Sequence, residues 1–351
     1  SLKDEEFAAD LSSVIRGSAP PQYGDAATFF RYTYPTQGLR SILETVCRRV
    51  SGVGGELNSV ARLDTQFGGG KTHALIALVH AARGMKGVPN AAAFLDPSLI
   101  PRDEVRIAGL DGQNSDPANG LKLEDGLYAR SFWGELAYRI AGRAGFERVR
   151  ESDQRHIAPG VDTLRELFGD RPTLILIDEI AVYLRKVNDA FSGAATQFAA
   201  FLQALIQAVS TSPRVSLVLT LALRADDKSA RDAFKAEQET VQRAFDEAAN
   251  VVARKLLTLD PTQEHETIEV LRTRLFERID VDRARGVLDA YFDLWERNKA
   301  ALPAVTPELR DQFRKGYPLH PETLGVLTRK ISSLANFQRT RGMLRLLART
   351  V

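Results

Sequence analysis

The chain has 351 residues, with 47 Lys and Arg against 45 Asp and Glu, so its formal net charge is +2. Its 26% charged and 44% hydrophobic residues exclude collagen-like, low-complexity and disordered classes of protein. The single cysteine, Cys47, excludes a disulfide framework and a multi-cysteine zinc site, and the near-neutral charge gives no general argument for nucleic-acid binding.

The length and the two ends of the chain suggest its organisation. The length predicts two to three domains. No apolar run is long enough to cross a bilayer and the first residues have no signal-peptide character, so we expect a cytoplasmic protein without a membrane segment. Because the chain starts without Met and stops inside the apolar helical pattern of residues 342–351, we also expect a segment of a longer protein.

The first elements lead to a glycine-rich loop. A mostly polar segment ends near Gln37, and apolar residues then recur at helical spacing from Leu39 to Val50. A short strand over 59–64 runs directly into three glycines at 68–70. The dense Ala, Leu, Ile and Val of residues 74–82 predict a helix that is buried on most sides.

The remaining elements alternate between strand and helix. The strands expected along the chain are 59–64, 104–110, 173–178, 215–220 and 251–259. A loop is expected at 111–120. After it, helices are expected at 127–141, around 198–209 and over the charged stretch 227–250. The unbroken apolar run of 173–178 is typical of a central strand covered on both faces. Everything after Pro261 is expected to be helical.

This order of elements predicts an α/β fold of three layers, α/β/α, with a parallel sheet, followed by an all-helical lid. The expected boundaries are an N-terminal extension with a helix at 1–57, an α/β domain at 58–260 and a helical lid domain at 261–351.

The segment Thr65-Gln-Phe-Gly-Gly-Gly-Lys-Thr72 has the features of a phosphate-binding loop. Glycines let backbone N–H groups curve around phosphate oxygens at a helix N-terminus, a Lys reaches the β and γ phosphates, and the next hydroxyl ligates Mg²⁺. Gly70, Lys71 and Thr72 fit these roles. The usual pattern has Gly where this chain has Thr65, and Gly68 and Gly69 can supply the flexibility instead. A glycine turn beside a surface lysine is the alternative.

The strand 173–178 ends in two adjacent acids, Asp178 and Glu179. A carboxylate at the tip of a central strand can hold Mg²⁺, and the next acid can polarise an attacking water. Asp178 suits the metal role and Glu179 the general-base role, although acids at strand ends also occur as ordinary caps. In parallel sheets ligands lie at the carboxyl ends of strands, where both this pair and the glycine loop fall.

Two weaker features accompany these segments. Thr220 ends the strand after Glu179, where its hydroxyl could sense the γ phosphate or be structural. Arg341 and Arg345 lie at the start of the last expected helix, where an arginine could stabilise transition-state charge or be a solvated helix end. Residues 312–351 hold eight Lys and Arg against one acid, and this surplus could face nucleotide, nucleic acid, a neighbouring subunit or the rest of a longer protein.

The order of these parts resembles that of the AAA+ P-loop ATPases, in which they are named Walker A, Walker B, sensor 1 and sensor 2. More narrowly, the segments 67–73, 132–137 and 337–342 look like the large bacterial ATPases catalogued as domain of unknown function 499. Those proteins are much longer and are encoded beside DNA methyltransferases in phage-defence islands, including the BREX type. The resemblance implies an N-terminal ATPase portion and adds Phe67 and His73 to the nucleotide-binding set.

We therefore predict an ATPase motor or switch with ATP and Mg²⁺ as ligands. A homo-oligomer, and phage-defence partners such as a DNA methyltransferase, are implied by the resemblance alone. The alternatives are a nucleotide-gated scaffold with little turnover and a DNA-binding module.

Overall fold

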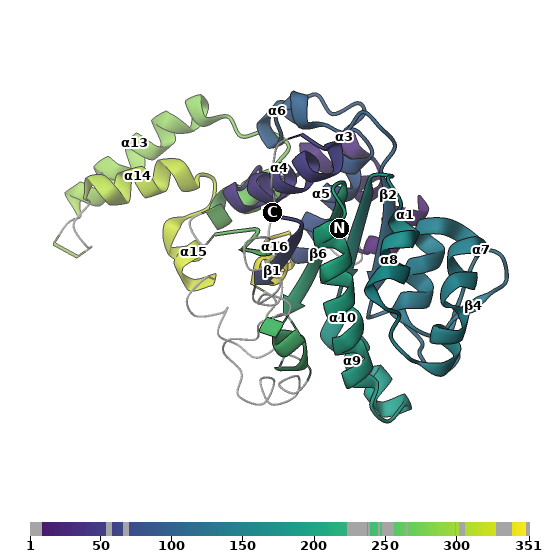
Figure 1. Ribbon diagram of the computed structural model, residues 1–351. Coiled ribbons are helices and arrows are strands. Elements are labelled where there is room, and N and C mark those ends of the chain that lie inside the picture. The colour runs from purple at the N-terminus through teal and green to yellow at the C-terminus, as the bar shows by residue number, and fades with distance from the viewer. Residues whose placement is uncertain are drawn as a thin grey trace. The chain divides into compact units, whose positions relative to one another are not determined.

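The computed structural model describes residues 9–53, 58–65, 70–222, 237, 239–244, 246–247, 256–263, 266–298, 300–301, 306–327 and 339–348 (Figure 1). Contacts divide them into two compact units, which we call the sheet unit, within residues 8–263, and the helical unit, within residues 264–351. No helix in the described ranges has an apolar stretch of the length and hydropathy needed to cross a membrane.

The sheet unit is built on a five-stranded parallel sheet in the order β2-β5-β6-β1-β7. Its strands are β1 (Val60–Thr65), β2 (Arg106–Asp111), β5 (Thr173–Asp178), β6 (Val215–Ala222) and β7 (Leu256–Leu259). Strands β1, β2 and β6 are labelled in Figure 1. The predicted parallel α/β sheet is therefore confirmed. Of the strand expected over 251–259, residues 251–255 lie outside the described residues.

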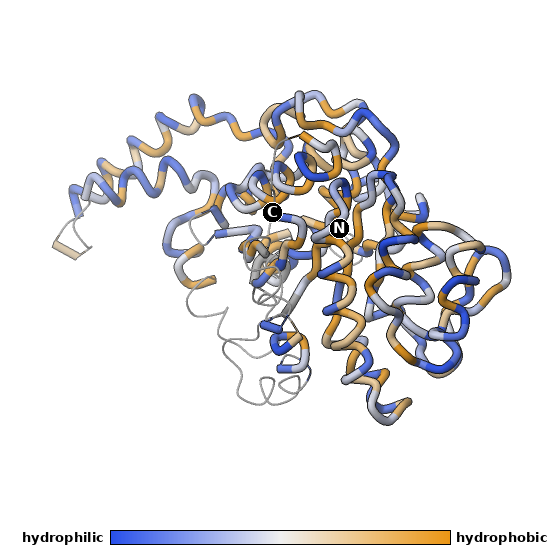
Figure 2. Tube along the Cα trace, in the orientation of Figure 1, coloured by the Kyte–Doolittle hydropathy of each residue, from blue (hydrophilic) through white to orange (hydrophobic). Residues whose placement is uncertain are grey.

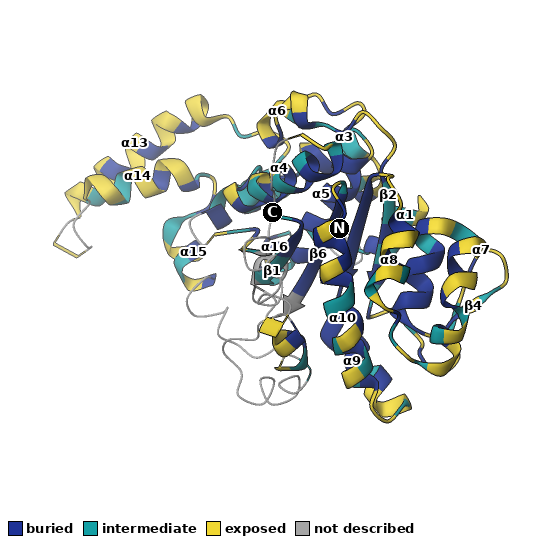
Figure 3. Ribbon diagram, viewed as in Figure 1, coloured by how far each residue is buried: buried dark blue, intermediate teal, exposed yellow. Residues whose placement is uncertain are grey.

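Helices cover both faces of this sheet. Alternate strand residues point to opposite faces, and on both faces they are apolar and need to be buried. On β5, Ile175 and Ile177 enter one core and Leu174 and Leu176 enter the other, and every residue of the strand is buried. Figure 3 shows that most of the sheet is buried beneath the helices. The helices that pack on the first core are α7 (Phe132–Arg155), α8 (Val161–Phe168), α9 (Ile180–Ala190) and α10 (Ala194–Thr211). Those that pack on the second are α1 (Leu11–Arg16), α3 (Ala26–Arg31), α4 (Gln37–Ser51) and α5 (Lys71–Ala82).

The helix after the glycine loop is central to the second core. Ten residues of α5 are buried, as its dense apolar sequence predicted. The segment before α4 packs against it, because Phe29 and Phe30 of α3 are fully buried and contact the ring of His80. The remaining short helices on this side are α2 (Pro21–Gly24), α6 (Ala91–Phe94) and the 3₁₀ turn η2 (Pro97–Leu99).

One region differs from expectation. The helix expected from residue 127 begins as α7 at Phe132, because the Ser131 hydroxyl accepts a hydrogen bond from the Gly134 N–H and caps the helix there. Before it lies a small antiparallel pair that the sequence pattern did not indicate, β3 (Leu121–Lys122) and β4 (Tyr128–Ala129). The α7 axis also breaks at Ala141 and Gly142, where the backbone leaves helical geometry.

In the described part of the helical unit, all regular elements are helices, as the sequence predicted. They are α12 (Thr267–Leu275), α13 (Val281–Arg297), α14 (Pro307–Gly316), α15 (Pro321–Val326) and α16 (Arg339–Leu347). The alternation of hydrophobic and hydrophilic residues along α13 is visible in Figure 2. It buries Leu288 and Phe292 against Phe313 of α14 and leaves charged residues outside.

Candidate functional site

The N-terminus of α5 and the carboxyl ends of β5 and β6 meet in the sheet unit. The Thr72 hydroxyl donates to Asp178 Oδ2 at 2.7 Å, and the Thr220 hydroxyl donates to Asp178 Oδ1 at 2.5 Å. Because β6 lies between β1 and β5, Thr220 stands between the strand of the glycine loop and the strand of the acids. The structure thus brings together three residues that the sequence singled out separately.

Gly70 caps the N-terminus of α5 in the left-handed region, at φ 85°. Glycine adopts this conformation without strain, and it lets the loop turn directly into the helix. The first amides of α5 have no partner within the helix, so with the helix dipole they favour an anion at this end. The predicted loop residues Phe67, Gly68 and Gly69 lie outside the described residues.

Lys71 opens α5 and is buried, with 7% of its surface exposed. Burial lowers the pKa of its ammonium below the ordinary lysine value, while the carboxylates of Glu179, Asp178, Asp260 and Asp64 raise it. Burial outweighs the carboxylates. The site therefore holds a cation that has lost much of its hydration, which strengthens its attraction for a polyanion.

Glu179 joins β5 to α9 with an unusual backbone. Its φ of 54° and ψ of 44° place it in the left-handed region, which a residue with a side chain adopts at an energetic cost. The Glu179 N–H points back to Asp178 Oδ1 at 3.1 Å and Thr220 Oγ1 at 3.3 Å. The left-handed backbone and these two hydrogen bonds make a sharp turn at Glu179, between β5 and α9.

The remaining predicted residues are placed as follows. His73 Nε2 lies 2.9 Å from the Thr33 hydroxyl, and its ring packs on Phe29 of α3, so its described contacts are with the core. Arg341 and Arg345 belong to α16 in the helical unit, and their roles at the site stay predictions.

Three acids near the site were not singled out from the sequence. Asp64 is the next-to-last residue of β1, and Asp111 is the last residue of β2. Asp260 follows β7 directly. Asp111 is in register with Asp178 on the neighbouring strand. Their position at strand ends was the available signal, since parallel strands bring all their carboxyl ends to one edge.

The side chains at this edge include oxygen donors of the kind that a hard divalent cation takes. Thr72 and Asp178 supply a hydroxyl and a carboxylate oxygen within 2.7 Å of each other, the donor types that Mg²⁺ prefers. Among the described residues, no group of three or more His, Cys, Asp or Glu forms a metal cage of its own. A cation held by few protein oxygens completes its shell with phosphate oxygens and water.

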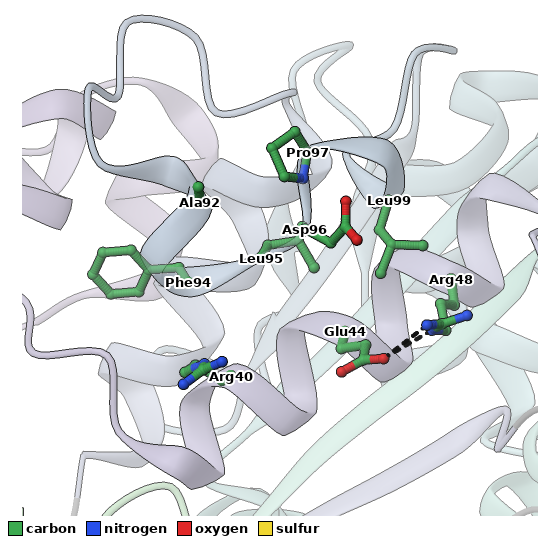
Figure 4. A pocket seen from close by; sticks show the side chains of 9 residues that line it. All are labelled: Arg40, Glu44, Arg48, Ala92, Phe94, Leu95, Asp96, Pro97 and Leu99. Atoms are coloured by element: carbon green, nitrogen blue, oxygen red, sulfur yellow. Dashed lines mark hydrogen bonds and ion pairs between the residues drawn. The ribbon is translucent and has the colours of Figure 1, made fainter.

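A separate cavity of about 460 Å³ lies between α4 and the segment of α6 and η2 (Figure 4). Arg40 and Arg48 line it together with the carboxylates of Glu44 and Asp96, and Glu44 pairs with Arg48 at 2.9 Å. Its charges balance, so it offers no net attraction for phosphate. We therefore do not assign phosphate binding to this cavity.

Glu135, on α7, is another buried carboxylate of the sheet unit. Burial raises the pKa of Glu135 to about 7, Arg139 and Arg16 lower it, and Asp111 raises it. Arg139 is an ion-pair partner, at 3.3 Å. Because the folded pKa lies above the ordinary 4.5, the folded protein holds a proton that the unfolded chain releases. The free energy of unfolding should therefore fall as the pH rises from about 4.5 to about 7.

Glu135→Gln should remove this contribution, because glutamine does not titrate. We expect the variant to gain stability relative to wild type between pH 5 and pH 8, measured by urea unfolding at both values. Glu151→Gln, at an exposed position on the same helix, is the matched control and should show no such gain. An equal stability difference between Glu135→Gln and wild type at both pH values would contradict the shifted pKa.

Comparison with known families gave two matches. A model described as the DUF499 N-terminal domain matches residues 1–256, and one described as the DUF499 second domain matches residues 262–351. The interval between the two matches covers most of β7 and the turn after it, close to the end of the sheet unit. A search of curated proteins found no match.

Proposed function

The chain belongs to the DUF499 family, and from this premise we propose that it is an AAA+-like P-loop module that binds ATP and hydrolyses it with Mg²⁺. The observation that carries the proposal is the hydrogen bond from Thr72, at the start of α5, to Asp178, at the end of β5. This hydrogen bond brings together the two groups that are expected to hold Mg²⁺, the Thr72 hydroxyl and the Asp178 carboxylate. The general-base candidate follows in the next residue.

In this proposal the chain binds ATP through its triphosphate. The amides at the N-terminus of α5 and the ammonium of Lys71 bind the β and γ phosphates. Thr72 and Asp178 hold Mg²⁺, which would offset the negative charge of the phosphate oxygens. Thr220 holds the Asp178 carboxylate in place from the other side, through its own hydrogen bond.

Glu179 is the proposed general base. Its carboxylate accepts a proton from a water molecule as the water oxygen bonds to the γ phosphorus, and the bond from that phosphorus to the β–γ bridging oxygen breaks. The products are ADP and inorganic phosphate, and Glu179 returns the proton to phosphate or solvent. Asp178 is less suited to this task because both its oxygens already accept hydrogen bonds.

The biological role is a proposal from the resemblance alone. It suggests a motor or switch in a larger bacterial anti-phage system, with homo-oligomers, a DNA methyltransferase or DNA as partners. The surplus of Lys and Arg over residues 312–351 forms a basic tail, and among its described residues Arg314 pairs with Asp289 and Lys315 with Asp311. Direct DNA binding through this tail therefore has less support than nucleotide binding.

The test is to titrate the protein with a fluorescent ATP analogue and to measure phosphate release with Mg²⁺ and with a chelator. We expect saturable binding and phosphate release that needs Mg²⁺. The assay should span a range of protein concentrations, since a shared site becomes active only on association. Failure to bind nucleotide would contradict the proposal. Tight binding without phosphate release at any concentration would favour the scaffold alternative.

A further inference from the structure

The loop that follows β2 contacts the backbone of Glu179. Gly112, the first residue of this loop, donates its N–H to the carbonyl oxygen of Asp178 at 3.0 Å. A Cβ atom at Gly112 would lie 2.1 Å from the carbonyl oxygen of Glu179 and 2.9 Å from the backbone nitrogen of Tyr183. Contacts this short do not occur, so only glycine fits without a shift of the backbone.

The Glu179 carbonyl has little freedom to move away. It accepts hydrogen bonds from the N–H groups of Val182 at 3.1 Å and Tyr183 at 3.2 Å, which form the first turn of α9. The Tyr183 side chain is buried and stacks on Phe132 of α7, which fixes that turn in the core. A side chain at Gly112 would therefore push on the Glu179 peptide rather than on a flexible group.

The loop is itself held by side chains on both sides. Asp111 accepts hydrogen bonds from the Gln113 N–H at 2.8 Å and the Asn114 amide at 2.6 Å. Lys186 of α9 donates to the carbonyl oxygens of Gln113 at 2.6 Å and Ser115 at 3.0 Å. The loop thus contacts α9 at two places, the N-cap residue Glu179 and the second turn at Lys186.

We propose that Gly112 is a positioning residue that holds Glu179 in its left-handed conformation, with Lys186 fixing the loop against α9. This inference rests on the proposed function, because a general base acts only when its carboxylate is correctly placed. The left-handed backbone sets the direction in which the Glu179 side chain leaves the main chain, and the close approach of Gly112 to the Glu179 carbonyl keeps this backbone from relaxing. A displacement of about 1 Å at a catalytic group can cost about 100-fold in rate.

Gly112→Ala tests the proposal. The backbone φ of Gly112 is outside the left-handed region, so alanine adds only a steric contact. We expect kcat for ATP hydrolysis to fall roughly 10- to 100-fold. The affinity for the fluorescent ATP analogue should stay within about twofold, since the loop does not touch Lys71 or Thr72 in any described contact. Gly160→Ala, where nothing lies within 4 Å of the added carbon, is the matched control and should match wild type.

A double variant separates positioning from general damage. If Gly112 acts through Glu179, Gly112→Ala should lower hydrolysis in wild type but cause no further loss when Glu179 is already glutamine. A loss of the same size in both backgrounds would overturn the proposal, as would full activity of Gly112→Ala. Lys186→Met should lower kcat in the same direction by a smaller factor without weakening nucleotide binding. If it weakens binding instead, the loop serves the nucleotide and not Glu179.

The failure of this inference differs from the failure of the proposed function. Wild-type protein that hydrolyses no ATP would overturn both, whereas active wild type with an equally active Gly112→Ala would overturn only the inference.

Discussion

Glu179→Gln is expected to lower the rate of ATP hydrolysis by about 10²- to 10⁴-fold while the protein still binds ATP. Glutamine keeps the size of the side chain and the backbone turn at the end of β5 but cannot accept the proton of the attacking water. In the proposed site the phosphate contacts come from α5 and the metal contacts from Thr72 and Asp178, and Glu179 is assigned to the chemical step. Rate and affinity should therefore separate.

The measurement is phosphate release under single-turnover conditions, together with equilibrium binding of the fluorescent ATP analogue. Glu104→Gln makes the same chemical change at an exposed position at the opposite, amino end of β2, and it should hydrolyse ATP at the wild-type rate. Hydrolysis by Glu179→Gln at the wild-type rate would show that another group takes the proton. Loss of binding would instead assign Glu179 to the nucleotide pocket.

Lys71→Met has the second large expected effect, on binding. Methionine fills the space of the buried stem but removes the charge, and a hydrogen bond to a charged group contributes about 1.5–3 kcal/mol. This corresponds to a loss of ATP affinity of roughly 10- to 100-fold. The loss is expected to reach the larger value because the ammonium is buried and its partner is a polyanion.

The stability of the unliganded protein provides the internal control. Burial lowers the Lys71 pKa, which means that the folded protein holds this charge at a cost in free energy. Lys71→Met should therefore melt no lower than wild type without nucleotide, yet show a much smaller rise in melting temperature when ATP is added. Lys86→Met, at an exposed position just beyond the same helix, should keep the full ATP-induced rise. A variant that melts lower but retains this rise would contradict the role of Lys71.

Much of the sheet and of the candidate site could be predicted because both follow from simple patterns. An unbroken apolar run indicated β5, and the polar residues at strand ends indicated Thr220, Asp178 and Glu179. The structure brings these three together with Thr72, as a parallel sheet requires. The roles assigned to them stay predictions.

Other features lacked a local signal. The pair β3 and β4 is only two residues long in each strand, too short for alternation to be recognised. Gly112 follows an aspartate in a polar stretch and resembles any turn glycine, since its importance comes from the Glu179 carbonyl, 67 positions later in sequence. Long-range steric contacts of this kind are not encoded in the neighbouring residues.

The position of β1 between β6 and β7 has a consequence for how the sheet unit folds. Val60 pairs with Leu217 on one side and with Leu256 on the other, so both neighbours of β1 come much later in the chain. During synthesis β1 is made early and remains without its partner strands until almost the whole sheet unit has been made. Such non-local pairing slows folding and leaves the edges of an unpaired strand open to aggregation meanwhile. The edge of the sheet where Thr72, Asp178 and Thr220 meet is therefore expected to assemble only after most of the sheet unit has been made.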